Sequence, residues 1–160
     1  MERIGRILEH SLYRENLKRN KAEELDREFC RHDMGHFLDV ARIGTILSLE
    51  EGETVDRELI YAAALLHDIG KNLQYTQGIS HERASAQISC VILPECGFDE
   101  KETRVIIDAI LSHRNIATAG EGGLKGLLYR ADKASRACFA CDVEQNCNWK
   151  DDRKNLQVKV

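Results

Sequence analysis

The sequence predicts an all-α protein, a single bundle of about six to seven helices that spans residues 1–160. Apolar residues recur every three to four positions through almost the whole chain, which is the spacing of one helix face. The alternation typical of a strand occurs only in the tail, at Leu156, Val158 and Val160. A hydrophobic content of 42% over 160 residues is enough for one core, which at this length buries about 70% of the surface of the unfolded chain.

The helices of the first half follow from their apolar faces and from residues typical of helix ends. A first amphipathic helix covers residues 4–12, and the lysine-rich segment 18–21 is expected to be a solvated break. A long helix is then predicted from about Ala22 to Leu49. Asp56 is placed to cap the next helix, and Gly70 to end it in the left-handed conformation that glycine favours.

The second half contains three further helices. Ser80 is placed to cap a helix that ends at Pro94, because the residue before a proline disfavours the helical conformation. Asp99 and Glu102 have the spacing of a capping box, which predicts the start of the next helix. After a glycine-rich loop, the apolar residues from Leu124 onward predict the last helix.

Charge and composition exclude several classes of protein. The formal net charge of −4 argues against a broad surface for nucleic acid, which needs a basic face. The sequence has no run of some 18 apolar residues, and its first residues start a helical pattern, so we expect no membrane partner and a cytoplasmic chain. The apolar faces can all be buried in one core, and a homo-oligomer stays open.

Six residues of metal-ligand type lie where the predicted helices can present them to a common centre. They are His36, His67, Asp68, His81, His113 and Asp132. A core does not need that many buried imidazoles and carboxylates unless a cation satisfies them. Adjacent side chains on a helix point about 100° apart, so His67 and Asp68 cannot face one ion in the same way.

Two ions, or one ion and a water molecule, satisfy this geometry. We expect Asp68 to bridge two ions, with His36, His67 and Asp132 on the first ion and His81 and His113 on the second. Imidazole and carboxylate ligands suit Fe, Mn, Zn, Co or Ni.

Ions held in this way predict hydrolysis of a phosphate ester or anhydride, because they activate water and polarise a phosphoryl oxygen. Asp68 is the candidate for orienting the nucleophile, and Lys71 and Arg114 are the first candidates among the cations that neutralise the substrate. Arg83 and Lys133 are the other candidate phosphate-binding residues.

The segment Ala63–Lys71, with His67-Asp68 at its centre, resembles the central motif of the HD-domain superfamily of metal-dependent phosphohydrolases. The helix at His36 and the segment Tyr129–Lys133 resemble the first and last metal-ligand motifs of that superfamily. The resemblance spans roughly residues 31–136 and implies a helical HD-domain fold with His36, His67, Asp68 and Asp132 as shared ligands. The further histidines His81 and His113 are similar to those of the subset that binds two metals. That subset includes bacterial hydrolases of dinucleoside polyphosphates.

The predicted substrate is therefore a nucleotide or a related small phosphorylated metabolite. Two alternatives stay open at this point. Some HD-fold proteins resemble di-iron oxygenases, and a non-catalytic nucleotide or metal sensor would use the same ligands without turnover.

The C-terminal segment 138–160 carries a second pattern. Cys138, Cys141 and Cys147 form a C-x2-C-x5-C cluster, and three thiols at this spacing are a candidate half-site for a structural zinc or, less favoured, an iron–sulfur cluster. Cys30 is the first candidate for the fourth ligand, and His32 is the alternative. The other interpretation is that these are reduced thiols packed as small apolar side chains.

Overall fold

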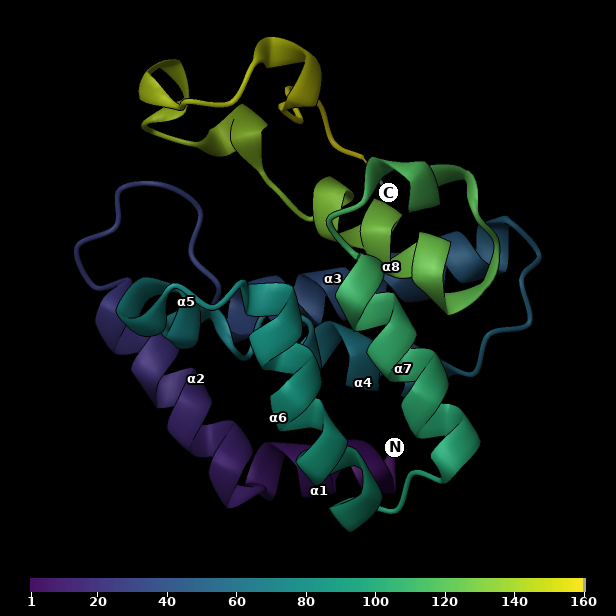
Figure 1. The fold of residues 1–160 in the computed structure, drawn as a ribbon. Helices are drawn as coiled ribbons and strands as arrows, with labels where there is room; N and C mark the ends of the chain where they lie inside the picture. The colour runs from purple at the N-terminus through teal and green to yellow at the C-terminus, as the bar shows by residue number, and fades with distance from the viewer. Residues whose placement is uncertain (160) are drawn as a thin grey trace.

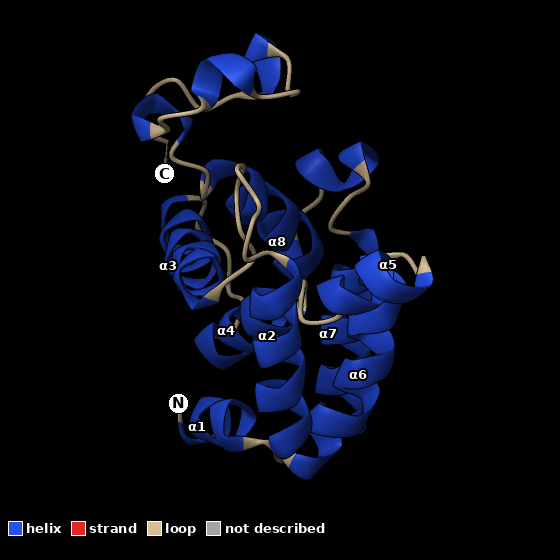
Figure 2. Ribbon diagram, turned by 90° about the vertical axis from the view of Figure 1, so that its left-hand side faces the viewer, coloured by secondary structure: helices blue, strands red, loops and turns tan. Residues whose placement is uncertain are grey.

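The computed structural model describes residues 1–159, which form only helices and loops (Figure 2). The α-helices are α1 (Glu2–Glu9), α2 (Ser11–Glu23), α3 (Met34–Glu50), α4 (Arg57–Leu66), α5 (Lys71–Gln77), α6 (His81–Glu95), α7 (Glu100–Ser112) and α8 (Gly123–Ala134). Short 3-10 helices lie at Ile116–Gly120, Cys138–Ala140, Glu144–Asn146 and Asp151–Arg153. The all-α prediction is confirmed. Residues 156–159 form no strand, and Val160 lies outside the described residues. None of these helices combines the length and the apolar character that a membrane span requires.

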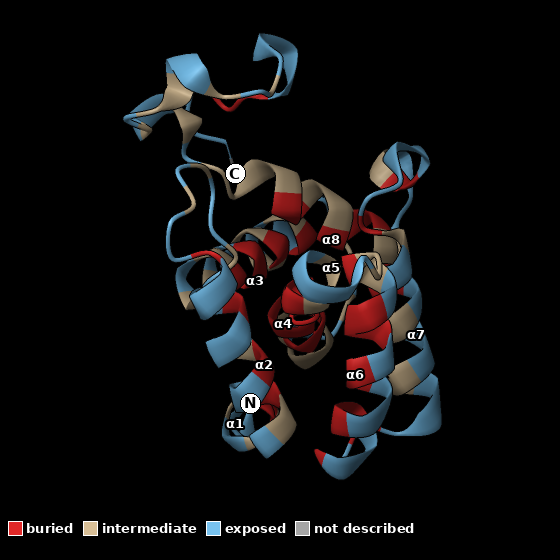
Figure 3. Cartoon of the chain, turned by 60° about the vertical axis from the view of Figure 1, so that its left-hand side comes forward, coloured by how far each residue is buried: buried red, intermediate tan, exposed pale blue. Residues whose placement is uncertain are grey.

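Helix α4 lies at the centre of the bundle (Figures 1 and 3). It packs against α1, α3, α6, α7 and α8, and its residues 62–66 are fully buried. A helix that is apolar on every side must be enclosed in this way. The Asp56 side chain caps its start by accepting a hydrogen bond from the backbone N–H of Glu58, as the sequence predicts. The C-terminal end of this central helix, at His67, is therefore held inside the protein.

The long helix predicted from Ala22 to Leu49 is two helices in the structure. Helix α2 continues through residues 18–21, which we had expected to be a break, and ends at Glu23; α3 begins only at Met34. The side chain of Asp33 caps α3 by accepting a hydrogen bond from the N–H of His36. Periodicity did not reveal the interruption, because the loop between the two helices is held by long-range polar contacts.

Gly70 has a role other than the one predicted. Its φ is −88°, so it does not end α4 in the left-handed conformation, and it begins the short helix α5 instead. A Cβ atom at Gly70 would lie 2.5 Å from the backbone nitrogen of Ser85 on α6, and the N–H of Gly70 donates to the Ser85 hydroxyl (2.9 Å). Glycine is required here because the turn after α4 touches the backbone of α6.

The predicted ends of α6 and α7 are mostly confirmed. Ser80 occupies the cap position of α6 without a side-chain hydrogen bond, and Pro94 lies inside the last turn of that helix rather than after it. The capping box of α7 is present, with the Asp99 side chain accepting from the N–H of Glu102 (2.8 Å) and the Glu102 side chain accepting from the N–H of Asp99 (3.0 Å).

Beyond α8 the chain forms an irregular segment, residues 138–159, that stands above one end of the bundle (Figures 1 and 2). Asn155 is buried and fastens this segment to the end of α8. Its side-chain amide donates to the carbonyl oxygens of Lys133 (2.7 Å), Ala134 (3.2 Å) and Arg136 (3.0 Å). These carbonyls at the end of a helix have few partners within it, so one amide satisfies several of them.

We expect the substitution Gly70→Ala to lower the free energy of unfolding by about 1–3 kcal/mol, because the new methyl group must push the turn away from α6. The matched control is Gly5→Ala in α1, where nothing lies within 4 Å of the added Cβ. Alanine there should raise the free energy of unfolding by about 0.5–1 kcal/mol. Denaturant unfolding measures the change in the free energy of unfolding for both variants. Equal stability of the two variants would contradict this account of the close approach.

Candidate metal centre

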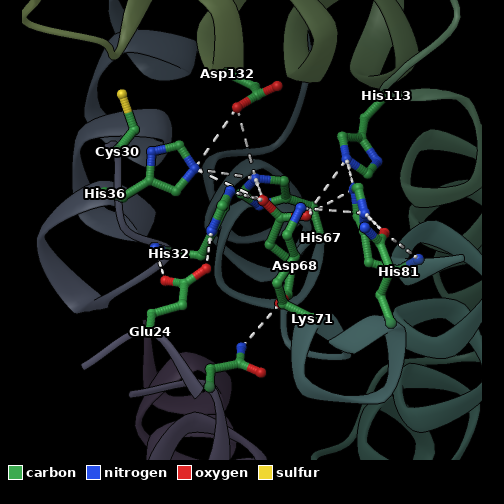
Figure 4. Close-up of polar contacts among 12 residues, drawn as sticks. Glu24, Cys30, His32, His36, His67, Asp68, Lys71, His81, His113 and Asp132 are labelled. Carbon is green, nitrogen blue, oxygen red and sulfur yellow. Dashed lines mark hydrogen bonds and ion pairs between the residues drawn. The ribbon is translucent and has the colours of Figure 1, made fainter. Parts of the chain in front are cut away.

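All six predicted ligands converge at the buried end of α4 (Figure 4). His36 lies in the first turn of α3, His67 and Asp68 directly follow α4, His81 begins α6, His113 follows the last turn of α7, and Asp132 lies on α8. All are buried except His36, which is partly exposed. Residues almost a hundred positions apart in the sequence therefore share one polar centre within the helical bundle.

The six side chains form two groups of three. The first group is His36, His67 and Asp132, and the second is Asp68, His81 and His113. Within each group, the candidate ligand atoms lie within 4.8 Å of one another.

The two histidines of each group face each other through Nε2. The Nε2 atoms of His36 and His67 are 3.3 Å apart, and those of His81 and His113 are 3.2 Å apart. Two nitrogen ligands on one ion, with bonds of about 2.0–2.1 Å and a tetrahedral angle, stand about 3.4 Å apart. The spacing of both pairs therefore fits a shared ion.

Asp68 connects the two groups. Its Oδ2 lies 3.4 Å from Nε2 of His67, while its Oδ1 lies 3.1 Å from Nε2 of His81 and 3.5 Å from Nε2 of His113. Oδ1 is buried and accepts no hydrogen bond. Since a buried carboxylate oxygen without a partner is costly, this atom indicates a place for a cation.

Hydrogen bonds at Nδ1 fix the tautomers of the histidines that directly follow helices α4 and α7. Nδ1 of His67 donates to the carbonyl oxygen of Ala64 (2.7 Å), and Nδ1 of His113 donates to that of Ile110 (2.6 Å). A carbonyl only accepts, so Nδ1 carries the proton in both rings and the neutral ring keeps its lone pair on Nε2.

The same tautomer holds for the other two histidines. Nδ1 of His36 lies 3.2 Å from the hydroxyl of Ser135, which already donates its proton to the carbonyl of Asp132 and therefore accepts from the ring. Nδ1 of His81 lies 2.6 Å from the side-chain oxygen of Gln74, whose orientation is set because it also accepts from the backbone N–H of His81. Lone pairs thus face each other in both pairs, and a cation between them removes the repulsion.

The electrostatics of the centre favour neutral imidazoles and ionised carboxylates. Burial lowers the pKa of His36, lowers that of His67 to about 4 and lowers that of His81 to about 3. For His113, burial acts in the same direction, but the carboxylate of Asp68, 3.5 Å from Nε2, outweighs it and raises the pKa. A bound cation would take the place of that proton.

Burial would raise the pKa of both aspartates, but neighbouring groups outweigh it. His67 and His113 hold the pKa of Asp68 well below its ordinary value, and Lys133 and His67 lower that of Asp132. Neutral imidazoles with ionised carboxylates are the states that bind metals. The residues therefore fit divalent ions.

Sequence reasoning missed the polar residues behind the centre. Glu24 is buried, and its carboxylate accepts from the backbone N–H of His32 (2.6 Å), from Nδ1 of His32 (2.5 Å) and from the hydroxyl of Tyr75 (2.6 Å). This directs Nε2 of His32 toward Oδ2 of Asp68, 3.6 Å away. The buried amide of Asn20 donates to the backbone carbonyl of Asp68 (3.0 Å). Nothing in the sequence spacing indicated Glu24 or Asn20.

A cavity of about 770 Å³ opens onto the centre. Three of the predicted phosphate-binding residues, Lys71, Arg114 and Lys133, line it. Lys71 is buried, with Nζ 3.3 Å from Nδ1 of His81, and burial lowers its pKa. Arg83 does not line the cavity and is exposed on α6. It follows His81 by two positions, which is about 200° around a helix, so its prediction as a phosphate-binding residue is withdrawn.

The cysteine cluster does not form a metal site within the described residues. Cys30, Cys138, Cys141 and Cys147 are free, and no three potential ligands among them come within 4.8 Å of one another. Cys30 and Cys138 do line the same cavity, so the two regions approach each other as expected. His32, the alternative fourth ligand, is engaged by Glu24 instead. A structural zinc at these cysteines stays a prediction that this arrangement does not support.

The HD domain family model matches residues 34–143. The chain belongs to the HD domain family. The fold also resembles a crystal structure of a predicted HD superfamily hydrolase from an uncultured Thermotogales bacterium, with a TM-score of 0.62 and 26% sequence identity over 89% of this chain and 81% of that one. Family membership supports a metal-dependent phosphohydrolase and leaves the substrate open.

One curated relative of this HD domain chain matches over its full length, and others match over a part of their length. An uncharacterized protein of Clostridium beijerinckii is 45% identical over 99% of both chains. Ribonuclease Y of Enterococcus faecalis is 31% identical over 65% of this chain, which corresponds to 18% of the ribonuclease. This chain thus matches about a fifth of the ribonuclease.

We expect added Mn²⁺ to raise the unfolding temperature of the wild-type protein and to have little effect on Asp68→Ala. A ligand that binds only the folded state stabilises it by about 2.7 kcal/mol at a hundred times its dissociation constant. His10→Ala is the matched control, because His10 contacts Glu95 away from the centre. If Mn²⁺ stabilises Asp68→Ala as much as the wild type, the ion binds elsewhere.

For protein stripped of metal with a chelator, we expect the free energy of unfolding to fall as the pH is lowered from about 6.5 to 4. His67 has a pKa of about 4 in the folded state against an ordinary 6.5, so the unfolded chain takes up a proton first on acidification. The contribution is on the order of 2–3 kcal/mol. Denaturant unfolding across this range should show a shallower pH dependence for His67→Gln. If the free energy of unfolding of His67→Gln depends on pH as strongly as that of the wild type, groups other than His67 cause the effect.

Proposed function

We propose that this HD domain protein hydrolyses a phosphate ester or anhydride of a nucleotide or a related small phosphorylated metabolite. One observation carries the proposal. The Asp68 carboxylate places one oxygen against each of two ligand groups, at the floor of a cavity lined by cations. This combination suits phosphoryl transfer, since positioning and charge stabilisation supply most of its catalysis.

The ligand sets support two divalent ions, one held by His36, His67 and Asp132 and one by His81 and His113, with Asp68 between them. Divalent ions bound there supply an activated water and polarise a phosphoryl oxygen. The protein's own contribution is to fix these side chains. The Nδ1 hydrogen bonds keep the ligating nitrogens aligned, and the backbone contact of Asn20 holds Asp68.

Three cations on the cavity wall would bind the substrate. Lys71 is buried beside the centre, where its ammonium can contact a phosphoryl oxygen near His81, and Lys133 forms an ion pair with Asp132. Arg114 and Lys133 line the same cavity, the first directly after α7 and the second on α8. A guanidinium and two ammonium groups around one phosphate neutralise the charge that would otherwise repel the two aspartates. The cavity volume lies within the range of about 300–1,000 Å³ that small-molecule sites occupy.

Cleavage of an RNA phosphodiester is the second candidate. The similarity to ribonuclease Y favours it, and the reaction would use the same centre. The acidic net charge and the limited cavity favour the small substrate.

We expect purified protein supplied with Mn²⁺ or Fe²⁺ to release phosphate or a nucleoside monophosphate from a panel of nucleotides, dinucleoside polyphosphates and a short oligoribonucleotide. Asp68→Ala should reduce the rate by about a hundredfold or more, and Lys71→Ala by a smaller factor. Lys101→Ala on the exposed start of α7 is the matched control. Phosphate analysis and chromatography of the products measure the activity.

The same substrate panel distinguishes the small-molecule phosphohydrolase from a nuclease, a sensor and an oxygenase. Preferred cleavage of the oligoribonucleotide would move the assignment to a nuclease. Binding without turnover under all metal conditions would favour a sensor, and oxygen consumption with iron would favour an oxygenase.

A further inference from the structure

The outer wall of the cavity comes from the C-terminal segment. Trp149, Asp152, Arg153 and Asn155 line the same cavity as five of the six candidate ligands, all except the fully buried His67. Of these positions, none falls within residues 34–143, the part matched by the HD domain family model. The wall is therefore a feature of this chain that the family match does not explain.

The wall is held in place at both ends of the segment. The buried amide of Asn155 binds the carbonyls at the end of α8, and the carbonyl of Asn155 accepts from the N–H of Phe139 (3.0 Å). Lys154 is also buried and donates to the backbone carbonyl of Glu144 (3.1 Å) and to its carboxylate (2.6 Å). These contacts make the segment part of the folded protein rather than a loose tail.

Trp149 forms a stacked pair with Arg136. The guanidinium carbon of Arg136 lies 3.7 Å from the centre of the indole ring. Arg136 lies two residues after the end of α8, and its charge acts on the imidazole of His36, so the pair stands near the first ligand group. Both side chains line the cavity. A flat aromatic ring and a planar cation thus lie on the wall of a cavity whose floor carries the candidate metal ligands.

The charge around this pair is positive. Arg31, Arg136, Arg153 and Lys159 line the outer cavity. Among the described residues that line it, Asp152 is the only carboxylate besides the two aspartates of the centre. This concentration of cations is unexpected in a chain with a net charge of −4. It favours a ligand with more negative charge than a single phosphate.

We propose that Trp149 and Arg136 form the binding site for the base of a nucleoside phosphate whose phosphoryl group reaches the centre at Asp68. A bare phosphate or a phosphorylated sugar has no group that uses an indole ring. A base stacks on aromatic rings and on guanidinium planes, and such stacking contributes about 1–3 kcal/mol per base. The proposal rests on the phosphohydrolase proposed above and specifies its substrate class.

Trp149 is the only tryptophan of the chain, so tryptophan fluorescence reports on ligands that bind at this ring. In the protein as purified, we expect AMP or GMP to quench the emission in a saturable way and ribose 5-phosphate and inorganic phosphate to leave it nearly unchanged. Equal responses to AMP and ribose 5-phosphate overturn the proposal, and so does an unchanged emission with every nucleotide. This readout does not depend on catalysis, so it separates the base site from the proposed activity.

Kinetics with the metal-supplied enzyme provide the second readout. Trp149→Ala should raise KM for the nucleotide about tenfold while kcat changes little, and Trp149→Phe should recover most of the affinity. Pyrophosphate hydrolysis should be affected much less. Phe139→Ala is the matched control, because Phe139 is an exposed aromatic residue of the same segment that does not line the cavity.

The two kinds of failure are distinguishable. A loss of kcat that is equal for nucleotide and pyrophosphate in Trp149→Ala, with no recovery in Trp149→Phe, would show a structural role only and overturn the base site. Absence of hydrolysis of any substrate by the wild type, together with quenching by AMP, would overturn the activity and support the base site. Circular dichroism melting verifies that the variants are folded.

Discussion

The structure depends on one ionised carboxylate that is buried without a hydrogen bond to one of its oxygens. Asp68 lies at the end of the central helix α4, and imidazole nitrogens that carry lone pairs face it from both sides. An apolar interior tolerates such a group only where a cation can balance it. The enclosure of α4 by five helices and the close contact of Gly70 with α6 serve to hold this carboxylate between the two groups of ligands.

The charges that line the cavity differ between its floor and its walls. The floor of the cavity is rich in ligands for cations, and its walls are rich in cations that bind anions. A phosphorylated substrate satisfies both, because its oxygens can contact the metal centre and the basic side chains together. The overall acidity of the chain makes the local basic wall a feature of the site rather than of the whole surface.

The six candidate ligands could be found from the sequence because each lies at a point where helix periodicity or a helix end defines its direction. The residues that support them could not. Glu24 and Asn20 precede the first ligand motif and act through contacts that cross 48 positions of the chain in the case of Asn20. Arg83 was misplaced because proximity in sequence was given more weight than the helical phase that directs it away from His81.

Fold class, helix caps at Asp56 and Asp99, and the order of the ligand motifs were determined by the sequence itself, because each depends on residues within a few turns of one another. Tertiary structure alone decided that the long predicted helix is broken at Glu24, that Gly70 serves a close helix contact, and that Trp149 lines the same cavity as the candidate metal centre. The physical reason is range: local periodicity encodes a helix and the side it buries, while contacts between distant segments form only when those helices pack.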